Sequence, residues 1–285
     1  MIKVLQSGLF TTIQDTGRFG FRNYGVPNGG VMDSISASLA NSLLNNHLDD
    51  AVLEITLIGP KIEFLHSSII AITGATSLIY LNADLIRLNK VYTVAKGDIL
   101  SFGVSIVGVR TYLAVKNGFK SIKILNSRSL FQEITPEINC KKGSIIPFDE
   151  FKIENNNHLV NSQIVFKKLF FETSILEVYK GPDFNLFSSS EMNKIIKAFY
   201  TISVKNSRMG YYFNEAVLPH SKSIITNPVL PGTIQLIPSG NLIVLMKDAQ
   251  TTGGYPRVLQ LSERSICILA QKGAGESISF KLTEI

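Results

Sequence analysis

The sequence contains no tryptophan, two cysteines and four histidines among its 285 residues. Cys140 and Cys267 form no CxxC pair and have no neighbouring histidine, which argues against a disulfide framework or a zinc site. The histidines show no HxxxH or HExxH spacing either. We therefore predict a protein without a metal centre.

Long apolar runs are also missing. No run approaches the roughly 18 residues of a membrane-spanning helix, and residues 1–6 contain no apolar core of a signal peptide. We expect a cytoplasmic protein that has no membrane partner.

Charged residues make up only 18% of the chain, against an average of about 25%, whereas apolar residues make up 45%. This composition excludes a disordered chain, since enough apolar side chains are present to form a core. It also indicates more apolar surface than a lone domain shows, so we expect a permanent protein partner.

The net charge of +6 invites comparison with nucleic-acid-binding proteins. However, the lysines are scattered almost singly, and no RNP, zinc-finger or basic-helix pattern combines them with aromatic residues. We predict no nucleic-acid partner.

Most of the chain is predicted to form β-strands. Short runs of β-branched and aromatic residues recur between Gly, Pro, Asn and Asp, at residues 51–57, 68–73, 111–115, 175–179, 232–237, 242–246 and 278–282. Many are continuously apolar, which is typical of strands that are covered on both faces, as in a barrel or a sandwich. Residues 265–269 form a similar run, so Cys267 is interpreted as a buried strand residue.

Two helices are predicted. Asp33 can cap a helix whose apolar positions, Ile35, Leu39 and Leu43, would form its core-facing side. Residues 188–191 match a capping box, and Met192, Ile195, Ile196 and Phe199 follow at helical spacing.

At about 150 residues per domain, the length predicts two domains. The polar stretch 154–158 is the best candidate linker, which gives a β-rich domain at residues 1–155 and a second at residues 156–285. The predicted fold class is therefore mainly β, with two β-rich domains, each a barrel or a sandwich, and few short helices.

Standard catalytic motifs are absent, because the chain contains no GxxxxGK[ST] loop, no GxGxxG and no GxSxG. Instead, three segments concentrate Gly, amide, hydroxyl and Arg outside the predicted strands and helices: 11–20, 206–211 and 248–257. Arg18, Arg22, Arg208 and Arg257 lie in or beside them, and the planar fork of arginine suits a carboxylate or an acyl phosphate.

Two interpretations of these segments stay open. They can form a polar cleft that presents backbone N–H groups to an anion. Alternatively, Gly253 and Gly254 turn a barrel corner, and Asp15 pairs with Arg18 only to fix its own loop.

The three segments belong to a longer series of motifs. In the first half these are residues 8–18, 32–33, 51–54, 72–75 and 112–115, and in the second half residues 181–182, 207–211, 230–235 and 245–257. With these motifs in this order, nearly the whole chain resembles the family of the 5-oxoprolinase C subunits, also called PxpC or KipA. The same family includes the allophanate hydrolase subunit 2-like part of the urea carboxylase carboxyltransferase domain.

The resemblance implies two β-barrel-like domains, of which the C-terminal one is cyclophilin-like, and an obligate KipI/PxpB-like partner. With a third, PxpA-like (LamB/YcsF-like) subunit, such pairs hydrolyse 5-oxo-L-proline to L-glutamate, with ATP used by the complex. Relatives instead move a carboxyl group from biotin to urea, so biotin belongs only to this alternative, and the chain has no Met-Lys-Met attachment site of its own. A further alternative is a regulatory protein that antagonises KipI by binding alone.

For the oxoprolinase hypothesis we predict three catalytic residues. Arg208 would bind the substrate carboxylate or a phosphorylated intermediate, and Asp15 or Asp248 would serve as base or proton relay. The predicted substrate-binding residues are Arg18, Tyr211, Gln250, Thr251, Thr252, Gly253, Gly254 and Tyr255.

The chain departs from the family pattern at several positions. Asn45 stands in a usual Val-Gly-Asn, and Asn126 in a usual Gly-Ser-Arg. Because asparagine tolerates left-handed backbone angles, we expect the first change to be mild. The second weakens the case for a ligand site in that loop, and Lys247 places a charge beside the predicted cleft, where it would alter substrate preference.

Overall fold

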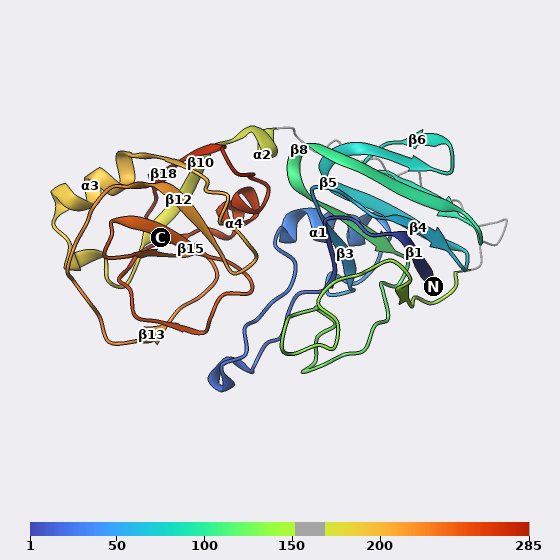
Figure 1. Cartoon of the computed structure of the whole chain (residues 1–285), viewed down its shortest axis with the longest axis horizontal. Helices are drawn as coiled ribbons and strands as arrows, with labels where there is room; N and C mark the ends of the chain where they lie inside the picture. The colour runs from blue at the N-terminus through green and yellow to red at the C-terminus, as the bar shows by residue number, and fades with distance from the viewer. Residues whose placement is uncertain (152–168, 285) are drawn as a thin grey trace. The chain divides into compact units, whose positions relative to one another are not determined.

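Figure 1 shows the computed structural model, which describes residues 1–151 and 169–284. The chain forms two compact units, the first from Met1–Arg18 and Gly29–Lys168, the second from Phe19–Asn28 and Leu169–Ile285. The chain thus enters the second unit twice, first for the short segment 19–28. The predicted linker 154–158 and the predicted boundary at residue 155 lie outside the described residues.

Among its described residues, the first unit is built on one large antiparallel sheet and one helix, α1 (Ser34–Leu43). The strands pair in the order β2-β3-β8-β4-β1-β9, and β5 pairs with β6, β7 and β8. Their bounds are β1 Ile2–Gln6, β2 Phe10–Gln14, β3 Val52–Thr56, β4 Lys61–Phe64, β5 Ser68–Leu81, β6 Asp84–Ile86, β7 Val91–Val94, β8 Ile99–Val115 and β9 Ile145–Ile146.

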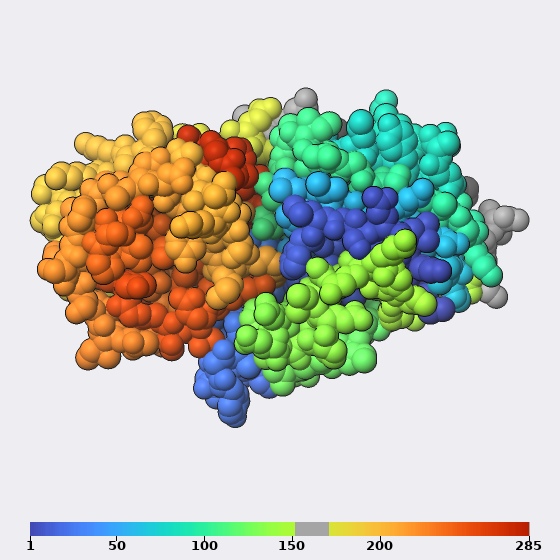
Figure 2. Space-filling model, in the orientation of Figure 1, coloured from blue at the N-terminus to red at the C-terminus, as the bar shows by residue number. Residues whose placement is uncertain are grey.

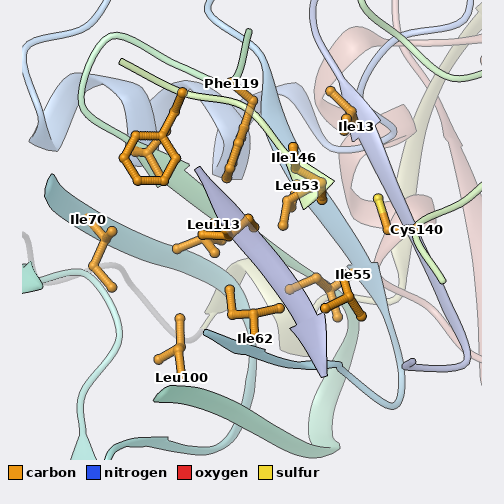
Figure 3. Close-up of a cluster of buried hydrophobic side chains, with 14 of the residues drawn as sticks. Ile13, Leu53, Ile55, Ile62, Ile70, Leu100, Leu113, Phe119, Cys140 and Ile146 are labelled. Atoms are coloured by element: carbon orange, nitrogen blue, oxygen red, sulfur yellow. The ribbon is translucent and has the colours of Figure 1, made fainter. Parts of the chain in front are cut away.

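Alternate residues of the central strands enter two different cores. On one face, Leu53 and Leu113 join a cluster with Ile13, Ile62 and Phe119, which Figure 3 shows pointing toward one another between the strands. The other face packs against α1 through a second cluster. Both faces of these strands are therefore covered, as their continuously apolar sequences predicted.

A long connection between β8 and β9 covers the edge of β2. Within it, the Leu130 N–H donates to the Ile13 carbonyl at 2.9 Å, and the Cys140 N–H donates to the Thr11 carbonyl at 2.7 Å. In Figure 2 this connection appears in light green against the N-terminal strands in dark blue. It brings residues 127–129 beside the end of β2, where Asp15 lies.

The second unit contains a curled sheet with the order β11-β18-β10-β17-β14-β15-β12. Its ends meet, since Ile202, just after β11, bridges Phe213 of β12, and the Ser203 N–H donates to the Tyr212 carbonyl at 2.9 Å. The strands are β10 Ile175–Lys180, β11 Phe199–Thr201, β12 Gly210–Ala216, β14 Thr233–Leu236, β15 Asn241–Leu245, β17 Arg257–Leu261 and β18 Ser277–Leu282, with the separate pair β13 Asn227–Pro228 and β16 Thr252–Gly253.

The helical segments of the second unit are short. They are η1 Arg22–Tyr24, α2 Leu169–Glu172, η2 Phe184–Leu186, α3 Ser189–Lys197 and α4 Glu263–Ala270. The predicted fold class is confirmed: the chain is mainly β, with two barrel-like sheets and few short helices. None of the helices among the described residues is long and apolar enough to span a bilayer.

Three local predictions need correction. Cys267 lies in α4 and not in a strand, because Ser262 caps a helix by accepting from the Ser265 N–H at 3.2 Å. A five-residue apolar run cannot distinguish a buried helix from a buried strand. Phe199 lies outside the second predicted helix, since α3 ends at Lys197 and Phe199 begins β11.

The third correction concerns the buried face of α1. Asp33 caps the helix as predicted, with the Ser36 N–H donating to its carboxylate at 3.0 Å. The buried residues, however, are the small ones, Ser36, Ala37, Ala40 and Asn41, whereas the predicted Ile35, Leu39 and Leu43 are only half-buried. Small side chains allow the helix to lie close to the sheet.

Candidate functional site

The first predicted segment is organised by the carboxylate of Asp15, which follows β2 and is 8% exposed. Its Oδ1 accepts from the hydroxyls of Ser127 and Ser129, both at 2.6 Å, and from the Gly17 N–H at 2.9 Å. Its Oδ2 accepts from the Arg128 N–H at 2.6 Å. A carboxylate with four donors fixes two loops against each other.

The sequence analysis missed residues 127–129 as partners of Asp15. They lie more than 110 positions away, and the only signal was that Asn126-Ser127-Arg128 stands where the family usually has Gly-Ser-Arg. Asn126 has a left-handed φ of 64° there, as glycine would. The loop therefore has a defined structural role beside Asp15.

Arg18 is fully buried, and its guanidinium donates to the Ser129 carbonyl. It therefore contacts the same loop as Asp15. The predicted ion pair between Arg18 and Asp15 stays a prediction.

Several motif residues of the first unit meet in a buried polar cluster. The Glu54 carboxylate accepts from the Met32 N–H at 2.7 Å and from the Tyr112 hydroxyl at 2.9 Å, and Arg110 lies 3.8 Å away. The Tyr112 hydroxyl accepts from the Asp33 N–H at 2.8 Å. Burial and the nearby carboxylates raise the pKa of Tyr112 well above its ordinary value, so it remains a donor to Glu54. This cluster anchors the beginning of α1.

In the second unit, the structure brings two predicted catalytic residues together. The Nε of Arg208 donates to Oδ2 of Asp248 at 2.7 Å, and a terminal nitrogen donates to Oδ1 at 3.0 Å. Both residues are 8% exposed, and the Asp248 N–H donates to the Arg208 carbonyl at 2.9 Å. This bidentate pair joins segment 206–211 to segment 248–257.

The residues after Asp248 form a turn whose side chains are largely exposed. Gln250 and Thr252 are exposed, and Tyr255 is 45% exposed. The backbone of the turn is fixed to the neighbouring segment, because the Thr251 carbonyl accepts from the Val229 N–H at 3.0 Å. The turn therefore presents amide, hydroxyl and phenol groups on a fixed backbone.

The two glycines of the turn differ. A Cβ on Gly253 would lie 2.5 Å from Nε2 of Gln235, which is buried and donates to the Tyr255 carbonyl at 3.1 Å. A Cβ on Gly254 would meet only the Thr226 hydroxyl, at 3.6 Å. Close packing therefore requires glycine at Gly253, whereas Gly254 has room for a side chain or a ligand.

Tyr211 lies elsewhere in the unit. Its side chain is fully buried on β12, and its hydroxyl donates to the Lys272 carbonyl at 3.4 Å. It supports the barrel interior behind segment 206–211.

Arg257 at the end of the third segment also has a local partner. Its Nε donates to Oδ2 of Asp183 at 2.8 Å, and another nitrogen donates to the Pro228 carbonyl at 3.1 Å. Burial alone would raise the pKa of Asp183, but hydrogen bonds and charge from Arg257 outweigh it and lower that pKa. Sequence reasoning missed Asp183, which stands next to the motif Gly181-Pro182.

The predicted site residues thus divide between the two units: Asp15 and Arg18 belong to the first, and the others belong to the second. Residues 24–282 match the family described as carboxyltransferase domain, subdomain A and B. The chain belongs to this family. The resemblance drawn from its motifs is thereby confirmed.

The relatives of this chain include two proteins that are named as the C subunit of 5-oxoprolinase. The protein from Escherichia coli is 30% identical, and the match covers 98% of this chain and 90% of that protein. The protein from Haemophilus influenzae is 28% identical, and the match covers 100% of this chain and 92% of that protein. The crystal structure of the K. lactis urea amidolyase matches 98% of this chain with a TM-score of 0.82 and 26% identity. This chain spans only 18% of that longer protein.

Proposed function

We propose that the chain is the C subunit of an ATP-dependent 5-oxoprolinase, which hydrolyses 5-oxo-L-proline to L-glutamate together with a KipI/PxpB-like and a PxpA-like subunit. The observation that carries the proposal is the 30% identity to the 5-oxoprolinase C subunit of Escherichia coli over 90% of that protein. In this proposal the chain is active only within the complex.

The turn at 250–255 is the proposed substrate contact of the second unit. Lactam hydrolysis develops negative charge on the carbonyl oxygen, and fixed donors stabilise that charge. Gln250 and Thr252 are exposed donors on a held backbone, and Gly254 leaves room for close approach. We therefore assign the orientation of the lactam to Gln250 and Thr252.

The geometry favours a positioning role for Arg208 and Asp248. The Nε edge of the Arg208 fork is occupied by Asp248, and both Asp248 oxygens accept hydrogen bonds. Because the pair lies at the base of the turn, it would hold Gln250 and Thr252 in place.

The N-termini of α1, α3 and α4, in the described part of the chain, do not favour binding of the phosphates of ATP. Nucleotide phosphates commonly bind at a helix N-terminus through free backbone N–H groups. In α1, α3 and α4 such a group is already bonded to the side chain of Asp33, Ser188 or Ser262. We assign ATP binding to the complex as a whole.

The site assignment is tested with the chain mixed with its partner subunits, by measuring ATP-dependent release of glutamate. Gln250→Ala and Thr252→Ala should each lower kcat/KM about tenfold, equivalent to ~1.4 kcal/mol, because each removes one hydrogen bond to the reacting group. Their melting temperatures should not change. Asn193→Ala, which truncates an exposed amide on α3, is the matched control and should keep full activity.

A second candidate is the carboxyltransferase part of a biotin-dependent system. The family description and the similarity to urea amidolyase favour it. The ureido ring of biotin is planar like the lactam, so the same exposed donors suit both. Avidin, which sequesters biotin, should then abolish carboxyl transfer to urea by the reconstituted system; activity that resists avidin excludes this candidate.

A further inference from the structure

The first unit contains a small cavity beside Asp15, of about 140 Å³. Four separate stretches of its chain form it: 15–17, 49–51, 120–123 and residues 126 and 128. We call it the Asp15 cavity. Its charged lining comprises Asp15, Asp49, Asp50, Lys120, Lys123 and Arg128.

The three cations of the Asp15 cavity have no carboxylate hydrogen-bonded to them among the described residues. Lys120 donates to the Asn117 carbonyl at 2.5 Å and lies 3.9 Å from the exposed Asp149. The Arg128 guanidinium donates to the Ser121 carbonyl. Lys123 has neither a hydrogen bond nor an ion pair with any residue that the structure describes. The cationic groups of Lys123 and Arg128 can therefore each bind an anionic group within the cavity.

The carboxylates of the cavity differ from one another in their partners. Asp15 is saturated by four donors and fixes the backbone of Arg128. Within the described part of the chain, the Asp50 carboxylate accepts only from the His47 N–H, at 3.1 Å, and the carboxylate of the exposed Asp49 accepts from no residue. Asp49 and Asp50 are therefore available to accept from a nitrogen donor.

Charges of both signs around one cavity restrict the ligand. A simple oxyanion would face Asp49 and Asp50, and a simple cation would face the three basic side chains. A molecule with a carboxylate and a nitrogen donor satisfies both sets. The volume lies well below the roughly 300–1,000 Å³ of pockets for drug-sized ligands, so the molecule must be small.

We propose that the Asp15 cavity binds a small amino-acid-like ligand. Its carboxylate would contact Lys123 and Arg128, and its N–H or ammonium group would contact Asp49 or Asp50. The choice of ligand rests on the proposed function: 5-oxo-L-proline and L-glutamate both carry these groups, one as substrate and the other as product.

Calorimetric titration of the full chain tests the proposal, with 5-oxo-L-proline, L-glutamate and inorganic phosphate in separate arms. Because the turn at 250–255 is proposed to act only within the complex, we expect the isolated chain to bind one or both amino-acid ligands saturably in a 1:1 ratio at the Asp15 cavity. The separate arms identify substrate or product as the occupant. Lys123→Gln and Asp49→Asn should each weaken this binding at least tenfold. Lys96→Gln removes the same charge from an exposed lysine that does not line the cavity, and should bind like the original chain.

The proposal is overturned if neither amino-acid ligand binds, if phosphate binds more tightly than both, or if Lys123→Gln binds as tightly as the original chain. Glutamate release by the reconstituted complex separates this failure from failure of the proposed function. Turnover without ligand binding at the cavity rejects only the proposal that the Asp15 cavity is a binding site. Ligand binding without turnover rejects only the proposed oxoprolinase function.

Discussion

Asp15 is a predicted catalytic residue whose contacts support a second explanation. Its position in a Gly-rich motif suggested a base or proton relay. The structure gives its oxygens four donors from two distant loops, so the geometry supports a positioning residue. The two roles lead to different experimental results.

Asp15→Asn should lower the free energy of unfolding by roughly 1.5–3 kcal/mol, since an amide nitrogen would face a donor where a charged oxygen now accepts. Urea unfolding measures this change. Asp49→Asn makes the same replacement on an exposed carboxylate and should stay within about 0.5 kcal/mol. An Asp15→Asn chain with normal stability but no turnover in the complex would identify Asp15 as the base after all.

The glycine pair of the 248–257 motif gives a second prediction. Gly253→Ala should lower the melting temperature because its Cβ would displace Gln235, at a cost of about 0.5–1.5 kcal/mol for the lost hydrogen bond to Tyr255. Gly254→Ala should leave stability unchanged and lower activity, if the space beside it admits substrate. Thermal unfolding and glutamate release, measured on both variants, compare these effects. Equal stability of the two variants would contradict the packing argument.

Residue chemistry explains which substitutions were predictable. We expected Asn45 to replace a family glycine mildly, and its φ of 51° confirms a left-handed position. Asn126, with a φ of 64°, follows the same rule. The identity of their neighbours was not predictable, because backbone preference says nothing about which distant loop lies beside it.

At the scale of elements, local signals were reliable where a side chain bonds its own helix. Asp33 caps α1, and Ser188 with Glu191 forms the predicted capping box of α3. The prediction of a strand at Cys267 was wrong because it used the apolar run 265–269 alone, without the helix cap at Ser262. A cap followed by an apolar run favours a helix, and this signal was present in the sequence.

The contact between η2 and β17 makes stability depend on pH. The folded-state pKa of Asp183 lies below its ordinary value of 3.8, so the Arg257 pair stabilises the fold at neutral pH. This contribution is lost as pH falls from the unfolded-state value through the lower folded-state value. Asp183→Asn should therefore be less stable than the original chain at pH 7, and the difference should shrink below about pH 4.

Chemical unfolding of Asp183→Asn at pH 7 and pH 3 measures this effect. Asp84→Asn, at an exposed carboxylate of β6, is the control and should match the original chain at both pH values. A stability difference for Asp183→Asn that persists unchanged at pH 3 would show that the charge of Asp183 does not carry the effect.

At the scale of the whole molecule, the strand patterns predicted a mainly β chain whose strands are covered on both faces, and the family resemblance implied barrel-like sheets. They could not predict that segment 19–28 packs with the second unit, where Arg22 donates to the Val229 carbonyl. They also could not predict that Asp15 meets Ser129. Such contacts depend on tertiary packing between residues far apart in the sequence. The motifs show that these residues occur together in one chain, but not that they touch.

The central claim is that this chain completes an oxoprolinase. Its most direct test is the rate of glutamate formation from 5-oxo-L-proline and ATP by the KipI/PxpB-like and PxpA-like subunits, measured with and without this chain. We predict that glutamate forms, and ATP is consumed, only when the chain is present, and that avidin has no effect. Equal rates without the chain, or complete loss of activity with avidin, would contradict the account.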